Sequence, residues 1–138
     1  MESGDSNLVV ASLELAAERA GDLTALVYAR LFAEQPEMEA LFWRDRSGQI
    51  RGEMLAKVFE TLLDFVGERH FAEHLIQTSL VVHTEYAVPE TVFGTFFGVV
   101  MRSVREVLGA DWSSDIDAAW RAMLADLDRV VAAAKLAA

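Results

Sequence analysis

The sequence predicts an all-α fold of seven or eight helices of unequal length around one core. Glycines and prolines separate helix-length segments, and within these segments apolar residues recur every three or four positions. No segment sustains the alternation of apolar and polar residues that indicates a β-strand. The unequal lengths also argue against an up-and-down helical bundle. The separating residues are Gly21, Pro36, Gly48, Gly67, Pro89 and Gly109.

The first half of the chain is divided by a cap and a turn. We expect a first helix that begins near Asp5 or Ser6 and ends before Gly21, and Asp22 can cap the second helix. Pro36 then begins a short turn, which a polar loop follows. The apolar residues of the second helix and the turn are Leu23, Leu26, Val27, Leu31, Phe32, Phe42 and Trp43.

The second half of the chain carries four helical segments. From Arg51 the apolar residues follow the i, i+3, i+4, i+7 rule of a half-buried helix. A shorter helix runs towards His83, and a corner that contains Pro89 follows it. Two further helices complete the chain, one ending near Leu108 and one around Trp120. We expect the inner faces to include Leu55, Val58, Phe59, Leu62, Leu63, Val66, Phe96, Phe97, Val100, Val104, Met123 and Leu127.

Length and composition fit a single domain over residues 1–138. A chain of 138 residues falls within the usual size of one domain, and its 53% hydrophobic residues suffice for a core. The longest apolar run, over 92–101, is too short to span a bilayer, and the acidic N-terminus lacks the positive segment of a signal peptide. We therefore expect a soluble, cytoplasmic protein.

Cysteine content and charge exclude several functions. The chain contains no cysteine, which excludes a disulfide scaffold, thiolate catalysis and cysteine-ligated zinc. It carries 22 acidic and 12 basic residues, a net charge of -10, so it repels phosphate backbones and anionic lipids. We therefore expect neither a nucleic acid nor a membrane as a partner.

Three strings of residues stand in order along the chain: YARLFAEQPEMEALF at 28–42, HTEYAVPE at 83–90, and VLG at 107–109, before a last helix with Trp120. Together they resemble the globin family, in particular the bacterial single-domain haemoglobins and the haem domains of flavohaemoglobins. The resemblance covers nearly the whole chain. It implies a globin fold around a haem pocket, with haem b as the cofactor.

His83 is the candidate metal ligand. It shares a helix face with Ile76, Ser79 and Leu80, so its ring is expected to point into the core. From the residues alone, His83 is either a satisfied core histidine or a neutral imidazole ligand. The resemblance implies the second role, with His83 as the proximal ligand of the haem iron.

Tyr28 and Phe42 flank the turn proline, and each can be interpreted as core packing. The resemblance places Phe42 against the haem and Tyr28 on the ligand-binding side, where its O–H could donate to bound dioxygen. It also implies that Val88 and Phe93 line the haem pocket. Phe93 and Lys135 stand where flavohaemoglobin-type domains commonly carry a tyrosine and a glutamate that support the proximal histidine. Their absence weakens the case for a peroxidase or an efficient nitric oxide dioxygenase.

The helix that begins near Arg51 supplies the distal wall, and its register must be found by counting. Counting from Phe42 without a gap puts acidic residues on the buried face, whereas a loop shorter by one residue puts Leu55, Phe59 and Leu63 inside. In the second register, the resemblance implies that Arg51 stands at the family's distal gate and Leu55 over the iron. Because arginine stays charged, Arg51 would lean towards the haem propionates, and a solvated surface arginine is the alternative.

Residues 70–74 spell H-x-x-E-H, a motif of some zinc peptidases. On one helix face, His70 and His74 could hold zinc with Glu73 as the base. The motif fixes only three positions, so a solvated helix end is the favoured interpretation.

The sequence supports one leading function and two alternatives. The leading function is a globin that binds dioxygen, nitric oxide or carbon monoxide at a histidine-ligated iron, for oxygen transport, storage or gas sensing. One alternative is a nitric oxide dioxygenase with a separate reductase, since the chain has no flavin or nicotinamide fingerprint. The other is a haem-free signalling module, which is expected to fill the pocket or lose the histidine. A ligand-binding protein is favoured over an enzyme, and a homodimer is compatible with the sequence.

Overall fold

The computed structural model describes residues 3–85 and 90–137, with the side chains of 4–80, 83 and 95–134. These residues form six α-helices and two short 3₁₀-helices, and no strand occurs among them. The all-α prediction is therefore confirmed. The elements are α1 (Ser3–Ala20), α2 (Thr24–Glu34), η1 (Pro36–Phe42), α3 (Gln49–Val66), α4 (Ala72–Glu85), α5 (Glu90–Leu108), η2 (Gly109–Asp111) and α6 (Ser114–Ala137).

Several predicted boundaries agree with the structure. α1 ends immediately before Gly21, which adopts a positive φ of 66° that a glycine accommodates without strain. Asp22 accepts a hydrogen bond from the backbone N–H of Thr24 at 2.9 Å, at the start of α2. Pro36 begins η1. The turn and cap residues therefore separate the elements as their chemistry predicts.

The predictions for the corner after α4 and for Phe93 remain untested. Val88 and Pro89 lie outside the described residues, and the side chain of Phe93 in α5 also lies outside them. In the ranges that are described, none of the helices combines the length and the apolarity needed to cross a membrane.

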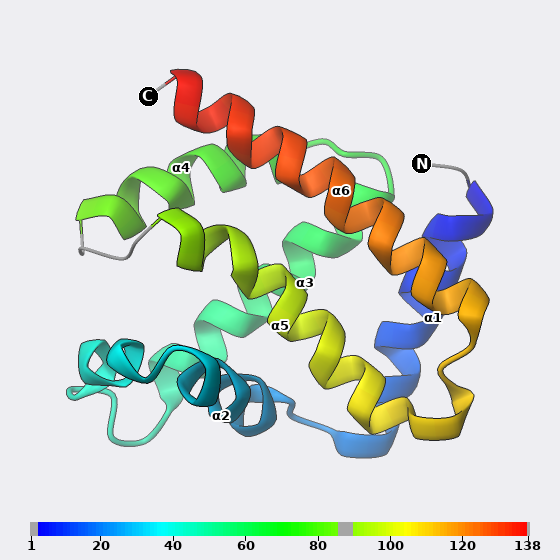
Figure 1. Cartoon of the computed structure of the whole chain (residues 1–138), viewed down its shortest axis with the longest axis horizontal. Coiled ribbons are helices and arrows are strands. Elements are labelled where there is room, and N and C mark those ends of the chain that lie inside the picture. Colours follow the sequence, from blue (N-terminus) through cyan, green and yellow to red (C-terminus); the bar gives the residue numbers. More distant parts are fainter. Residues whose placement is uncertain (1–2, 86–89, 138) are drawn as a thin grey trace.

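The helices cross one another around a shared apolar core (Figure 1). α5 runs through the middle of the molecule and packs on α1, α2, α4 and α6. α6 also packs on α1 and α4, while α3 packs on α1, α2 and α4. Residues of α2, η1, α3, α4 and α5 thereby come together around one pocket.

A buried chain of hydrogen bonds joins α6 to α1. The side chain of Trp120 is fully buried, and its indole N–H donates to the hydroxyl of Ser12 at 2.8 Å. Ser12 in turn donates to the backbone carbonyl of Val9 at 2.7 Å. A buried indole N–H needs an acceptor, and Ser12 provides it for Trp120, the largest side chain of the core.

Asp64 organises the corner between α3 and α4. Its carboxylate accepts hydrogen bonds from the backbone N–H groups of His70 at 3.1 Å, Phe71 at 2.9 Å and Ala72 at 2.7 Å. Burial acts to raise the pKa of Asp64, but the three N–H donors outweigh it and hold the pKa below its usual value. The first turn of α4 is therefore anchored to the end of α3.

Candidate functional site

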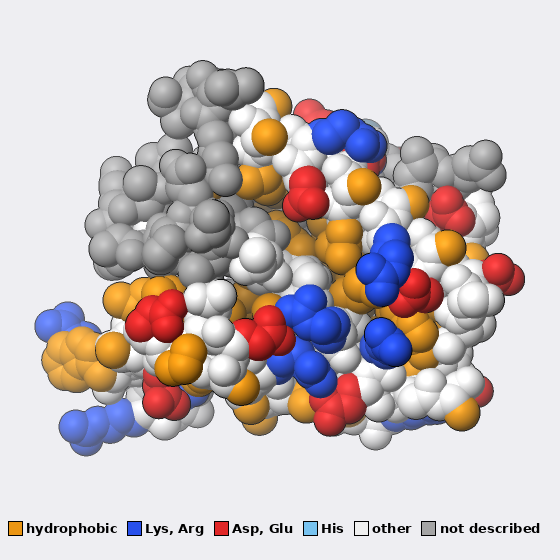
Figure 2. All heavy atoms as spheres, viewed as in Figure 1, with side chains coloured by type: hydrophobic (Ala, Val, Ile, Leu, Met, Phe, Trp, Pro, Cys, Tyr) orange, Lys and Arg blue, Asp and Glu red, His pale blue; other side chains and the backbone are white. Residues whose placement is uncertain are grey.

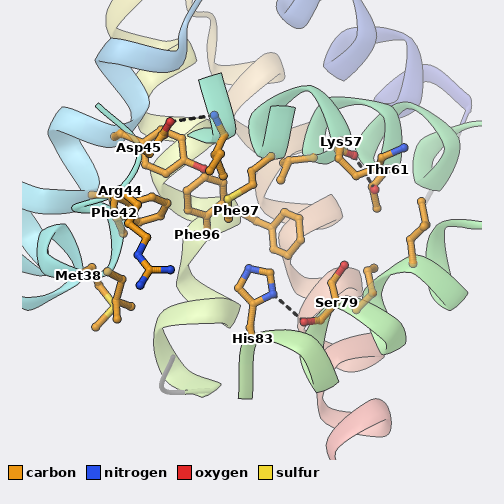
Figure 3. Close-up of a pocket in the computed structure, with 18 residues that line it drawn as sticks. Met38, Phe42, Arg44, Asp45, Lys57, Thr61, Ser79, His83, Phe96 and Phe97 are labelled. Carbon is orange, nitrogen blue, oxygen red and sulfur yellow. Dashed lines mark hydrogen bonds between the residues drawn. The ribbon is translucent and has the colours of Figure 1, made fainter. Parts of the chain in front are cut away.

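A pocket of about 650 Å³ opens between α2, η1, α3, α4 and α5 (Figure 3). Its walls are mainly apolar, and this volume lies within the roughly 300–1,000 Å³ of small-molecule sites. Three of the predicted site residues, Tyr28, Phe42 and His83, line the pocket. Arg51 and Leu55 are not among its lining residues. The residues that the structure brings together are thus the aromatic pair and the histidine.

His83 reaches the pocket from the last turn of α4. Its Nδ1 lies 2.7 Å from the backbone carbonyl oxygen of Ser79, one turn earlier. Because a carbonyl oxygen only accepts hydrogen bonds, we assign the proton of a neutral ring to Nδ1 and the lone pair to Nε2. Figure 3 shows the imidazole pointing into the pocket, towards Phe42 and Phe96. His83 therefore lies in the pocket wall with Nδ1 held by its own helix.

Among the side chains that the structure describes, His83 has no companions that would complete a metal site of protein ligands. Within the described residues, no three His, Cys, Asp or Glu side chains lie close enough to share a metal ion. One imidazole is fewer ligands than a metal site of protein side chains needs.

Tyr28 lines the pocket from α2 and is only 3% exposed. Its ring is packed among those of Phe32, Phe42 and Phe96, at centroid distances of 5.9, 5.5 and 5.6 Å. Burial raises the pKa of the phenol above its usual value, so the O–H stays protonated at neutral pH. Among the residues that the structure describes, the hydroxyl has no hydrogen-bond partner. The phenol is therefore a neutral donor that can serve a pocket ligand.

Asp45 is a buried carboxylate in the pocket wall, at the start of α3. It accepts hydrogen bonds from the backbone N–H groups of Ile50 at 3.0 Å and Arg51 at 2.9 Å, and from Arg51 Nε at 3.0 Å. Burial acts to raise the pKa of Asp45, but these hydrogen bonds and the guanidinium charge outweigh it and lower the pKa. Asp45 therefore fixes the first turn of α3 and holds the Arg51 side chain.

The face of α3 that lines the pocket is not the face predicted from the sequence. The residues of α3 that line the pocket include Ile50, Met54, Val58 and Thr61, whereas Leu55 is buried in the core. The Thr61 hydroxyl donates to the backbone carbonyl of residue 57 at 2.8 Å, so it is already satisfied.

The reason for the difference is the start of the helix. Gly48, at a positive φ of 79°, and the cap provided by Asp45 begin α3 at Gln49 rather than near Arg51. Since each residue turns a helix by about 100°, an error of one residue moves a whole face. Leu63, also expected inside, is correspondingly 44% exposed.

Charged side chains gather at the rim of the pocket. Arg44 lines the pocket and places its guanidinium 4.6 Å from the ring centroid of the exposed Trp43. Lys57 also lines it and forms an exposed ion pair with Glu60 at 2.9 Å. Figure 2 shows hydrophobic and basic side chains protruding together at the left end of this face, where Figure 1 places η1 and the loop after it. A ligand with acidic groups would therefore meet cations at the mouth.

The H-x-x-E-H string does not form a zinc site. His70 precedes the first residue of α4, so it does not share a helix face with His74. Its exposed ring lies 2.5 Å from a carboxylate oxygen of Glu68. As stated above, the described residues contain no cluster that could hold a metal ion. The motif is an exposed helix end.

Sequence reasoning missed several residues of the pocket, among them Met38, Met54, Arg44 and Asp45. The spacing of residues 50, 54, 58 and 61 is itself that of one helix face, which was the available signal for Met54. An aspartate shortly before a helix was the signal for Asp45.

A model of the family described as Globin matches residues 25–131, well over half of the chain. The matched range begins in α2, ends in α6 and contains Tyr28, Phe42 and His83. A comparison with curated proteins found no match.

Proposed function

The chain belongs to the globin family, and from this premise we propose that it binds haem b through His83 and takes up a diatomic gas in the same pocket. Dioxygen, nitric oxide and carbon monoxide are the candidate gases. The observation that carries the proposal is the His83 imidazole, which points into an apolar pocket of about 650 Å³ with Nδ1 bonded to Ser79. The strings at 28–42 and 83–90 further support a kinship with bacterial single-domain haemoglobins.

The residues of the pocket fit this cofactor. His83 would hold the iron, and Phe42 and Phe97 would pack against the apolar ring. Arg44 at the rim would pair with the ring's carboxylates, a role that Arg51, held by Asp45, does not fill. Val88 and Phe93 remain predictions from the resemblance. Haem would supply an iron with a position open to a diatomic gas.

Tyr28 would retain the gas. Its neutral O–H, buried and without a partner in the described chain, can donate to a ligand that carries partial negative charge. A hydrogen bond with charged character contributes about 1.5–3 kcal/mol, which corresponds to roughly ten- to a hundred-fold in ligand retention. Dioxygen, which is polarised when it binds, would benefit more than carbon monoxide.

The open pocket supports a haem protein over a haem-free signalling module. Kept dry and empty, 650 Å³ at ~24 cal/mol per Å³ would cost about 16 kcal/mol, against a typical domain stability of about 5–15 kcal/mol. This cost is an upper bound because the mouth admits water. A module without haem would need neither the open pocket nor a histidine that points into it.

Titration of the haem-free chain with haem tests the proposal. Wild-type protein is expected to bind one haem with a sharp Soret band, which shifts when carbon monoxide is added to the reduced protein. His83→Ala is expected to bind haem about tenfold or more weakly, because the axial ligand is gone. His74→Ala is the matched control, since His74 is an exposed histidine of the same helix outside the pocket. Equal haem affinity in the two variants would contradict the assignment of His83.

A further inference from the structure

Asp45 and Arg51 form an ion pair behind the distal wall of the pocket, where α3 begins. The Asp45 side chain is 4% exposed and lines the pocket, and its carboxylate is 3.0 Å from Nε of Arg51. Arg51 also donates from Nη2 to the backbone carbonyl of Asp45 at 2.8 Å. The carboxylate is fixed further by the backbone N–H groups of Ile50 and Arg51. We refer to this arrangement as the Asp45–Arg51 pair.

The pair keeps a permanent positive charge next to the pocket but outside it. Asp45 lines the pocket and Arg51 does not, although the two side chains are in contact. The guanidinium lies over Gly48, where an added Cβ would be 3.5 Å from Nη2. Arginine stays charged and has a long side chain with five N–H donors. Released from Asp45, it would have the length to turn towards the pocket.

A turn of Arg51 towards the pocket would matter because the Asp45–Arg51 pair lies near Tyr28, the proposed donor to a ligand. The charge of Arg51 acts to lower the pKa of the Tyr28 phenol and the charge of Asp45 acts to raise it, so both charges lie within reach of the ligand side of the pocket. The other cations of the pocket, Arg44 and Lys57, are exposed to solvent at the rim. Water screens those charges, whereas a guanidinium inside the pocket would be screened far less.

We propose that Asp45 is a positioning residue that holds Arg51 out of the pocket, so that the site favours neutral diatomic gases over anionic ligands. The inference rests on the proposed function, since it concerns ligands that compete at the same haem. With Arg51 held back, the buried side chain of Tyr28 offers the pocket a neutral donor, while the cations Arg44 and Lys57 lie at the exposed rim. A guanidinium in the pocket would add charge-assisted hydrogen bonds to an anion and give a neutral gas much less.

Fluoride and carbon monoxide are suitable probes, because one is an anion for the ferric protein and the other a neutral gas for the ferrous protein. Asp45→Asn is expected to raise fluoride affinity about tenfold or more, while carbon monoxide affinity changes by less than about twofold. In the double variant Asp45→Asn with Arg51→Met, fluoride affinity is expected to return to the wild-type value. Asp45→Glu, which keeps the carboxylate, is the matched control and should resemble wild type. Fluoride affinity that is unchanged in Asp45→Asn, or that stays raised in the double variant, would overturn the inference.

A second measurement uses the wild-type chain alone, in case Asp45→Asn does not fold. The Nε–H resonance of Arg51 is expected to be protected from exchange in the haem-free chain and in the diamagnetic ferrous carbon monoxide complex. A resonance that is unprotected in either form would show that Arg51 is not held and would overturn the inference. A chain without a Soret band after haem addition would overturn the proposed function and this inference together. Haem-loaded protein with unaltered fluoride selectivity would overturn only the inference.

Discussion

Tyr28 and His83 differ in how their polar atoms are satisfied. Nδ1 of His83 is bonded to the carbonyl of Ser79 at 2.7 Å, whereas the Tyr28 hydroxyl has no partner within the described chain. The hydroxyl is not one of the buried side-chain atoms that lack a partner, and the residue lines the pocket, so its O–H is accessible to a pocket ligand. We therefore interpret Tyr28 as a residue kept for a ligand rather than for the fold.

Replacing Tyr28 by phenylalanine separates these two roles. Tyr28→Phe is expected to speed dioxygen dissociation by roughly ten- to a hundred-fold, because a hydrogen bond of about 1.5–3 kcal/mol is lost. The free energy of unfolding of the haem-free chain should not fall, because the removed hydroxyl had no partner in the described chain. Stopped-flow dissociation and denaturant unfolding measure the two effects.

Thr61→Val is the matched control for this substitution. It also removes a hydroxyl from the pocket wall, but that hydroxyl already donates to a backbone carbonyl of its own helix at 2.8 Å. Its dioxygen dissociation rate is expected to stay near the wild-type rate. Equal rates in wild type and Tyr28→Phe would exclude Tyr28 as the donor.

α4 carries His83, and its position depends on the corner that Asp64 organises. Asp64→Ala removes the acceptor for three backbone N–H groups at the start of α4. Exchange of the amides of His70, Phe71 and Ala72 is expected to speed up about tenfold or more, since local opening becomes easier. Asp128→Ala, an exposed aspartate of α6, is the control and should leave these amides unchanged.

The same carboxylate predicts a pH dependence. The folded-state pKa of Asp64 is lowered from the ordinary 3.8, so its contribution is present above pH 3.8 and is lost as the pH falls through the lower folded value. The difference in Tm between wild type and Asp64→Ala should therefore be largest near neutral pH and shrink below pH 3.8. A difference that is independent of pH over this range would contradict the role of the charge.

The sequence predicts the helices better than it predicts which way they face. Turn and cap residues such as Gly21, Asp22 and Pro36 mark the ends of elements because their backbone chemistry is local. The rotation of α3 is not local. It depends on how Asp45 and Gly48 set the first turn, which a count of residues from Phe42 does not reveal.

The sequence of α3 contains two apolar faces, and either could be taken for the face that lines the pocket. One face contains Leu55 and Leu62 and packs in the core, and the other contains Met54 and Val58 and lines the pocket. Spacing alone does not tell a face that meets protein from one that meets a ligand, since both are apolar. The inward orientation of His83 was predictable from the helix face that it shares with Ile76 and Ser79, whereas its role as a ligand was predicted only from the resemblance.

The molecule as a whole combines a packed core with a pocket. α1, α5 and α6 pack together, and the hydrogen bond from Trp120 to Ser12 lies between α6 and α1. The pocket is formed by α2, η1, α3, α4 and α5, so α5 belongs to both. We expect the two regions to respond differently to substitution.

Ser12→Ala tests this separation. The free energy of unfolding is expected to fall by about 1–3 kcal/mol, because the buried indole N–H of Trp120 loses its acceptor. Gas affinity should remain unchanged, since Ser12 does not line the pocket. Ser114→Ala, at an exposed position, is the control and should change neither quantity. An altered gas affinity in Ser12→Ala with haem fully bound would contradict the separation.

Haem binding should stabilise the whole chain. A ligand that binds only the folded state adds about 2.7 kcal/mol at a free concentration of 100 times its Kd. The Tm of wild-type protein is therefore expected to rise with haem concentration. The Tm of His83→Ala should rise much less over the same concentrations, and thermal unfolding followed by circular dichroism measures both.

The most direct test of iron ligation by His83 is chemical rescue of His83→Gly. This variant is expected to lose the absorption spectrum of histidine-ligated ferrous haem, and added imidazole should restore it by occupying the space of the missing ring. Rescue by imidazole would establish that the residue acts as a ligand rather than as core packing. A His83→Gly protein that keeps the wild-type spectrum without imidazole would contradict the assignment.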